Sequence, residues 1–189
     1  MSLYELLLFL HVAMAAIWAG GAVMIQFFAL RILGSGEPAR QAALGGDVEW
    51  IANRLLIPAS LLAVVTGVAM VIESDAWSFG DDWVVIGLVL FAITFVAGTF
   101  FFGPESKRIG KLAEAEGPTS AAVQARVGRI LAFTRPDIVL LFLIIFDMSV
   151  KPSFGDVSLW VAVAVAAVLA FLLARHGLAT RVQPAPATE

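Results

Sequence analysis

Long apolar segments constrain the fold of this chain more than any other feature of its sequence. No charged residue occurs between Leu6 and Leu30, and a helix needs about 20 mostly apolar residues to cross the roughly 30 Å of hydrocarbon in a bilayer. Of the 189 residues, 60% are apolar and only 14% are charged. A water-soluble domain of this size could not bury so much apolar surface. We therefore predict an all-α fold, a polytopic transmembrane helical bundle.

The apolar pattern predicts five spans, which form a four-helix core and one additional C-terminal helix. We interpret the first span as a retained helix and not a signal peptide, because no basic residue precedes Arg31 and the charge-free run is too long for a signal-peptide core. We expect the core to comprise residues 1–152, the additional helix residues 153–176, and a disordered cytoplasmic tail residues 177–189. The predicted spans are residues 4–30, 51–72, 83–102, 130–150 and 157–174.

The basic residues predict the orientation of the chain, because lysine and arginine in short loops favour the cytoplasmic side of the membrane. One set of alternate loops and helix ends holds every basic residue except Lys151. The connection from Glu73 to Asp82 carries only acidic charges, which suits an external loop. We predict a bacterial inner-membrane protein with its N-terminus outside and its C-terminus inside. We expect the basic residues to contact lipid headgroups and not nucleic acid.

Polar side chains at membrane depth are candidate sites, because burying them in hydrocarbon is costly. With the predicted orientation, one group forms an outer polar layer. His11 is its central member and lies about 10 Å below Tyr4 along the first helix. Asp147 and Lys151 are four residues apart on one helical face, so we favour a mutual ion pair. The alternative is that Asp147 orients or deprotonates His11. The supporting members of this outer layer are Asp147, Lys151, Trp83 and Glu73.

His11 is the strongest candidate ligand, because histidine both binds metals and titrates near neutral pH. Met14 and Met148 lie nearby in this arrangement, and a thioether beside an imidazole can bind copper or serve as an axial haem ligand. The alternatives are a neutral histidine that is hydrogen-bonded to a neighbouring helix, and methionines that only fill space. His176 lies beyond the last span on the cytoplasmic side, so it cannot join His11 in one site.

A second polar layer is expected at the inner boundary of the membrane. Arg54 or Arg135 would pair there with Asp137 and anchor the helix ends. Small residues at four-residue spacing, such as Ala16 and Gly20 in the first span, predict close helix approach within the chain or in a homo-oligomer. The inner layer comprises Glu49, Asn53, Arg54, Glu105, Arg135 and Asp137.

Several short motifs, taken together, resemble a known family. The chain is similar to an uncharacterised bacterial integral-membrane family with a four-helix core, and more distantly to copper-resistance D proteins and HemJ-type protoporphyrinogen oxidases. The resemblance covers about residues 3–152. It implies that His11 matches an early histidine tied to haem binding, and the copper-resistance relatives imply copper transport. The motifs are Leu10-His11, Trp18-Ala19-Gly20-Gly21, Thr66-Gly67, Met148 and Lys151-Pro152.

Three functions remain open from the sequence. The first is a haem-binding or redox protein centred on His11, with haem b as the cofactor. The second is a copper or small-solute permeation protein, with His11 and Met14 as metal ligands. The third is a non-catalytic membrane subunit or assembly factor that binds a membrane-protein partner. We recognise no hydrolase triad, phosphate-binding loop or zinc signature, so no catalytic residue is assigned.

Overall fold

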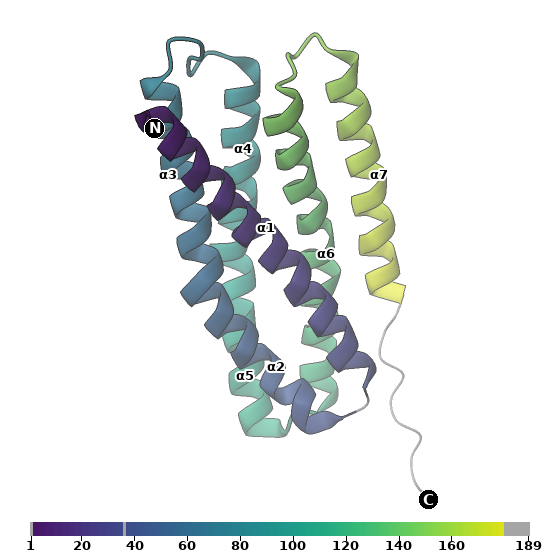
Figure 1. The fold of residues 1–189 in the computed structure, drawn as a ribbon. Helices are drawn as coiled ribbons and strands as arrows, with labels where there is room; N and C mark the ends of the chain where they lie inside the picture. The colour runs from purple at the N-terminus through teal and green to yellow at the C-terminus, as the bar shows by residue number, and fades with distance from the viewer. Residues whose placement is uncertain (1, 36, 180–189) are drawn as a thin grey trace, which may run out of the picture.

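The computed structural model describes residues 2–35 and 37–179. These residues form an all-helical bundle without strands, which confirms the predicted fold class. The N-terminus and the α3–α4 and α6–α7 connections lie at one end of the bundle, and the other connections lie at the opposite end (Figure 1). The helices are α1 (Leu3–Gly34), α2 (Pro38–Ile51), η1 (Ala52–Leu56), α3 (Ile57–Glu73), α4 (Asp82–Val96), η2 (Ala97–Phe102), α5 (Gly103–Glu116), α6 (Ala121–Val150) and α7 (Val157–Ala179).

Two of the long helices each contain a π-helical segment that ends two residues before a proline. The segment η1 joins α2 to α3 ahead of Pro58, and η2 joins α4 to α5 ahead of Pro104. Proline has no N–H, and its ring clashes with the carbonyl four residues earlier in a regular α-helix. Those carbonyls belong to Arg54 and Phe100, which lie inside the two π segments. The wider π turn therefore lets each helix continue through its proline.

The central helix of the bundle is α6, which contacts α1, α4, α5 and α7. Its side chains include the most deeply buried ones in the described chain, among them Leu141 at 2% exposure and Asp147 at 0%. Its neighbours therefore shield Asp147 from the surroundings of the bundle, whereas Arg129 and Ser149 of the same helix are exposed. In contrast, α7 packs mainly on α6 and exposes most of its apolar side chains.

Four stretches of helix are long and apolar enough to cross a membrane by length and composition. They are Leu3–Ile32, Ala43–Glu73, Asp82–Glu116 and Val157–Arg175. The predicted fourth span, residues 130–150, is not among them, because Arg135, Asp137 and Asp147 reduce its apolar character. The membrane-protein prediction is thus supported, while the count of five spans and the orientation stay predictions.

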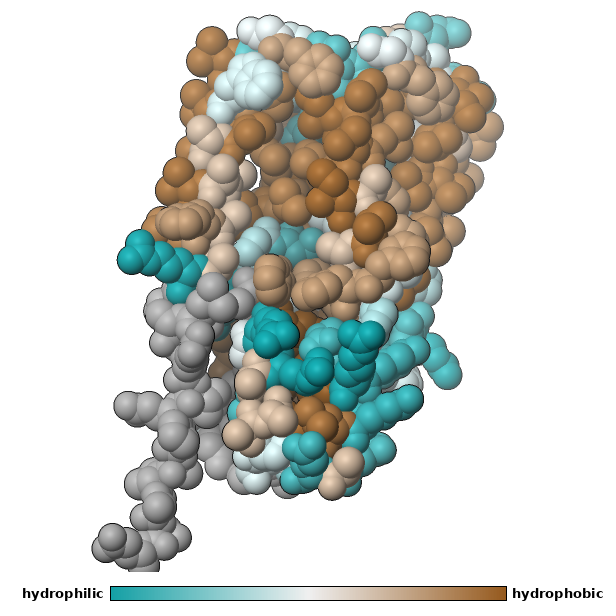
Figure 2. All heavy atoms as spheres, turned by 180° about the vertical axis from the view of Figure 1, so that it is seen from behind, coloured by the Kyte–Doolittle hydropathy of each residue, from teal (hydrophilic) through white to brown (hydrophobic). Residues whose placement is uncertain are grey.

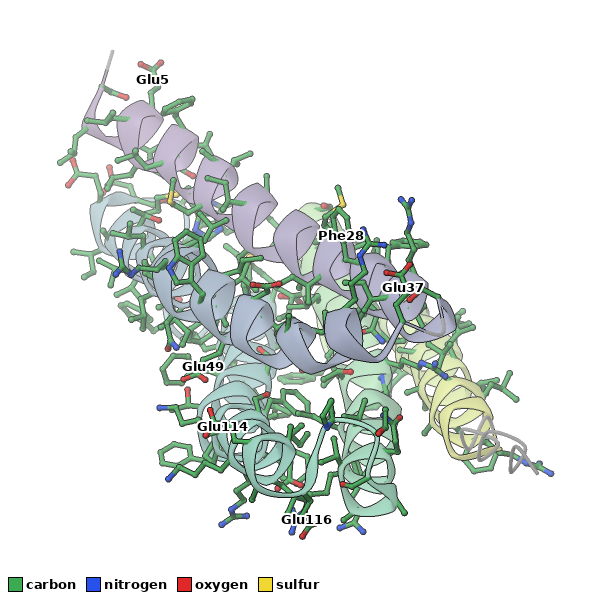
Figure 3. All side chains as sticks on the ribbon, turned by 90° about the horizontal axis from the view of Figure 1, so that it is seen from below. Glu5, Phe28, Glu37, Glu49, Glu114 and Glu116 are labelled. Atoms are coloured by element: carbon green, nitrogen blue, oxygen red, sulfur yellow. The ribbon has the colours of Figure 1, made fainter. Side chains whose placement is uncertain are left out.

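The surface of the molecule divides into an apolar region and a polar end. Figure 2 shows apolar residues over most of the height of the bundle, with hydrophilic residues gathered toward the end that contains α5. In the view from that end, the carboxylates of Glu114 and Glu116 point away from the bundle (Figure 3). The large apolar side chains exposed along the helices, such as Phe27 at 68% and Phe100 at 73%, suit contact with lipid.

Gly21 lets α1 pack closely against a neighbouring helix. The close approach of α1 to its neighbours involves Gly21, because a Cβ added there would lie 2.6 Å from a Leu56 methyl group, whereas a Cβ added at Gly20 would meet nothing within 4 Å. Gly21, and not the predicted Gly20, therefore faces the neighbouring helix.

At the C-terminus, α7 continues to Ala179, and residues 180–189 of the predicted tail lie outside the described residues.

Candidate functional site

His11 projects from α1 toward α3 and is held there by a hydrogen bond. Its Nδ1 atom lies 2.7 Å from the carbonyl oxygen of Ala63. Since a carbonyl oxygen can only accept, Nδ1 carries the hydrogen and donates it. The hydroxyl of Thr66 donates to the same carbonyl at 3.0 Å and to the carbonyl of Leu62 at 2.7 Å. This arrangement fixes both the orientation of the imidazole and its tautomer.

Gly67 provides the space that the imidazole occupies. A Cβ added at this glycine would lie 3.0 Å from Cε1 and 3.1 Å from Nδ1 of His11, which is closer than ordinary van der Waals contact. Glycine therefore allows α1 and α3 to approach with the histidine between them. The Thr66-Gly67 motif was noted in the sequence, but its role as the contact surface for His11 required the structure.

The second ring nitrogen of His11 is available to a ligand. Within the described residues, Nε2 has no hydrogen-bond partner, and it is not among the buried unpartnered atoms. In a neutral imidazole protonated at Nδ1, Nε2 carries the free lone pair. The described residues contain no group of three or more His, Asp or Glu side chains that could hold a metal ion. His11 can therefore supply one ligand, with Met14 one turn further along α1 as the nearest sulfur in sequence.

Asp147 lies in a separate contact between α6 and α4. The side chain is fully buried, and neither carboxylate oxygen has a hydrogen-bond partner in the described structure. It rests against Gly87, where an added Cβ would lie 3.0 Å from Oδ2 and would also collide with the methyl group of Met148. His11 donates the hydrogen bond that orients it to the carbonyl of Ala63 and not to Asp147. The predicted proximity of Asp147 to His11 therefore has no hydrogen bond to support it.

Lys151 does not form the expected ion pair with Asp147. Its ammonium group lies 4.0 Å from the ring centre of Trp77 and 5.0 Å from that of Trp83. Lys151 caps α6 in a left-handed conformation, with φ at 51°. The i,i+4 pairing rule applies only within a helix, and this cap turns the lysine side chain out of the helical register. The resulting contacts with two indole rings are cation–π interactions.

An open depression of about 330 Å³ lies at the end of the bundle that carries the α3–α4 and α6–α7 connections. Trp77, Trp83 and Lys151 contribute to its wall. The indole nitrogen of Trp83 is buried without a hydrogen-bond partner in the part of the chain that the structure describes. At this depression, the carboxylate of Asp82 accepts a hydrogen bond of 2.8 Å from the backbone N–H of Phe154, which links the start of α4 to the α6–α7 connection. The structure thus gathers Trp83 and Lys151 but leaves the predicted partner Glu73 exposed at the end of α3.

The inner polar layer is paired differently from the expectation. Glu105, only 8% exposed, accepts a hydrogen bond of 2.6 Å from Arg126 and therefore ties α5 to α6. Lys107 pairs with Glu49 at 3.5 Å and ties α5 to α2.

The predicted pairing of Asp137 with Arg54 or Arg135 is not formed among the described residues. Arg54 instead lies 5.9 Å over the ring of Trp50, and Oδ1 of Asp137 is buried without a partner. The expectation was based on which charged residues lie near helix ends in the sequence. The observed pairs depend instead on which faces of α2, α5 and α6 contact one another.

Comparison with known proteins identifies a family but no activity. A family model described as "predicted integral membrane protein (DUF2269)" matches residues 5–152. This range covers nearly all of α1 to α6 and excludes α7. No curated protein and no solved structure matches the chain. The similarity to copper-resistance D and HemJ-type proteins is not shown by these comparisons and stays a prediction.

Proposed function

The chain belongs to the DUF2269 family of predicted integral membrane proteins, and from that premise we propose that it is a haem-binding protein of the bacterial inner membrane. His11 would hold the haem iron through Nε2, near the outer surface. In this proposal α6 contains the fourth of five spans, with Asp147 shielded by the helices around it, and the N-terminus is outside.

One observation carries the haem proposal: the hydrogen bond from Nδ1 of His11 to the Ala63 carbonyl. Histidines that ligate metals commonly donate their other N–H to a carbonyl or a carboxylate, which fixes the tautomer and raises the basicity of the ligating nitrogen. The same carbonyl accepts from Thr66, and Gly67 allows the ring to lie flush with α3. His11 is therefore oriented with its lone pair free before any ligand is bound.

The number of available ligands favours haem over a metal ion held only by the protein. A bare ion needs several side chains, and the described residues offer no group of three from His, Asp and Glu. The porphyrin supplies four nitrogens to its iron, so one histidine is enough for axial ligation. A bound haem would supply one-electron redox chemistry, while the chain itself would hold and orient the iron through His11.

The test is an absorption spectrum of the full chain extracted in mild detergent from haem-replete cells. We expect a Soret band in the wild-type protein and in His176→Ala, which removes the other histidine of the chain. We expect the band to disappear in His11→Ala. A colourless wild-type preparation, or a band that His11→Ala leaves unchanged, would refute the proposal.

Copper is the second candidate, because Met14 follows His11 at i+3 on the same helical face, and an imidazole with a thioether suits copper(I). Metal analysis of the same preparations separates the two candidates. Copper that is lost in both His11→Ala and Met14→Leu, without a Soret band, would favour the copper site. Neither cofactor, together with a co-purifying membrane protein, would instead support a non-catalytic subunit.

A further inference from the structure

A partly open cavity lies between α1, α2, α5 and α6, at the end of the bundle that contains α5. Its volume is about 140 Å³. Its walls are mostly apolar and include Ile25, Leu44, Ile109, Val123 and Ile130. An apolar cavity of roughly 150 Å³ is large enough to bind benzene. The space is therefore the size of one six-membered ring.

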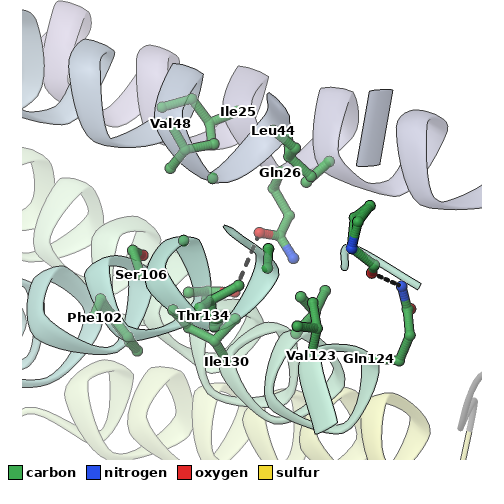
Figure 4. Close-up of a pocket in the computed structure, with 17 residues that line it drawn as sticks. Ile25, Gln26, Leu44, Val48, Phe102, Ser106, Val123, Gln124, Ile130 and Thr134 are labelled. Atoms are coloured by element: carbon green, nitrogen blue, oxygen red, sulfur yellow. Dashed lines mark hydrogen bonds between the residues drawn. The ribbon is translucent and has the colours of Figure 1, made fainter. Parts of the chain in front are cut away.

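One polar group in this cavity lacks a partner. The amide oxygen of Gln26 accepts a hydrogen bond of 3.4 Å from the hydroxyl of Thr134. Its amide nitrogen is buried and donates to no atom of the described residues. Figure 4 shows Gln26 reaching from α1 into the space between the helix pairs, with the amide oxygen turned toward Thr134. Leaving a buried donor without an acceptor is unfavourable, so the cavity contains an unfilled requirement for a hydrogen-bond acceptor.

Neither Ser106 nor Gln124, the other polar side chains of the wall apart from Thr134, accepts a hydrogen bond from this nitrogen. The side chain of Gln124 donates to the carbonyl of Pro118 at 3.0 Å and is thereby engaged. A buried water molecule typically needs two to four polar partners, and the wall around Gln26 is largely apolar. An apolar molecule with a single acceptor matches the cavity better than water does.

We propose that this cavity binds an apolar, membrane-soluble molecule whose carbonyl oxygen accepts a hydrogen bond from Nε2 of Gln26. The carbonyl can come from a quinone ring or from the acyl ester of a lipid. The cavity volume favours a ring or a short stretch of chain, with the rest of a longer molecule extending out between the helices. The proposal is independent of the haem proposal, because the two sites share no residue.

The test is calorimetric titration of the full chain in detergent with two matched probes. The first is 2-decyl-1,4-benzoquinone, and the second is decylbenzene, which has the same tail and ring size but no carbonyl. We expect the quinone to bind about ten times more tightly, because its carbonyl satisfies the buried donor. Gln26→Leu, which keeps the approximate side-chain volume but removes the donor, is expected to abolish this preference.

A second variant tests the location without removing a polar group. A Cβ added at Gly110 meets nothing within 4 Å, and replacing a glycine inside a helix favours helix formation. Gly110→Leu should therefore fold and occupy the cavity, and it is expected to lose binding of either carbonyl probe. Helical circular dichroism confirms that both variants fold.

The source of the carbonyl is separated by a second pair of probes. Dioctanoyl phosphatidylcholine has ester carbonyls, and its dioctyl ether analogue has none. Displacement of the quinone by the ester lipid but not by the ether lipid would assign the cavity to lipid. Quinone binding that neither lipid displaces would assign it to a quinone. Equal or absent binding of the carbonyl and carbonyl-free probes in both pairs, or unchanged binding in Gln26→Leu, would overturn the proposal.

Discussion

The contact between Gly67 and His11 can be tested by adding a single methyl group. In Gly67→Ala the new Cβ would lie 3.0 Å from Cε1 of the imidazole, so the ring must move and its 2.7 Å hydrogen bond to Ala63 must lengthen. Overpacking in a tight contact costs about 1–3 kcal/mol, and loss of a hydrogen bond costs about 1 kcal/mol. The better helix propensity of alanine offsets up to about 1 kcal/mol. We therefore expect a net loss of about 1–3 kcal/mol in the free energy of unfolding.

The assay is reversible unfolding of the purified chain in mixed micelles with increasing sodium dodecyl sulfate, followed by circular dichroism. The matched control is Gly20→Ala, because a Cβ at that position meets nothing within 4 Å and the change in composition is identical. Combining Gly67→Ala with His11→Ala should remove the clash, so the two effects should be non-additive by about 1–3 kcal/mol. Gly67→Ala as stable as the Gly20 control, or strictly additive effects in the double variant, would refute the contact.

Three further predictions follow from the charged residues and the orientation. Glu105→Leu should lower the free energy of unfolding by about 1.5–3 kcal/mol, because Arg126 loses the carboxylate that accepts its hydrogen bond; in the same assay, Glu114→Leu at an exposed position should change nothing. Lys151→Met should cost about 0.5–1 kcal/mol through loss of its cation–π contacts, and an unchanged stability would contradict them. Because the chain has no native cysteine, Ser78→Cys should react with an impermeant maleimide on whole cells, whereas Lys111→Cys should react only after permeabilisation; the reverse pattern would invert the orientation.

Much of the fold could be predicted from the sequence, because hydrocarbon demands long apolar helices whatever their neighbours are. The first, second, third and fifth predicted spans correspond to helices that are long and apolar enough to cross a membrane. The π segments before Pro58 and Pro104 were not predicted, although the prolines inside long apolar helices are a signal that could have indicated them. Residues 130–150 were harder to assign, because their charged side chains are tolerated only where other helices cover them.

The candidate site could be predicted only in part. His11 was identified because it is a lone histidine at membrane depth, and one alternative considered from the sequence, a neutral histidine bonded to a neighbouring helix, describes its Nδ1 contact. The ion pair of Asp147 with Lys151 was wrong, because the left-handed cap at Lys151 ends the helical register. The unpartnered amide nitrogen of Gln26 had no signal in the sequence, since its environment is built by separate helices.

The sequence by itself determined that the chain is a membrane helical bundle and which of its segments are long and apolar enough to cross a bilayer. Only the tertiary structure decided which residues of these segments meet. The physical reason is that the lipid-facing and protein-facing sides of a membrane helix are both apolar, so the hydropathy pattern does not set the rotation of a helix about its axis. Close packing sets it instead, through contacts such as His11 on Gly67 and Asp147 on Gly87.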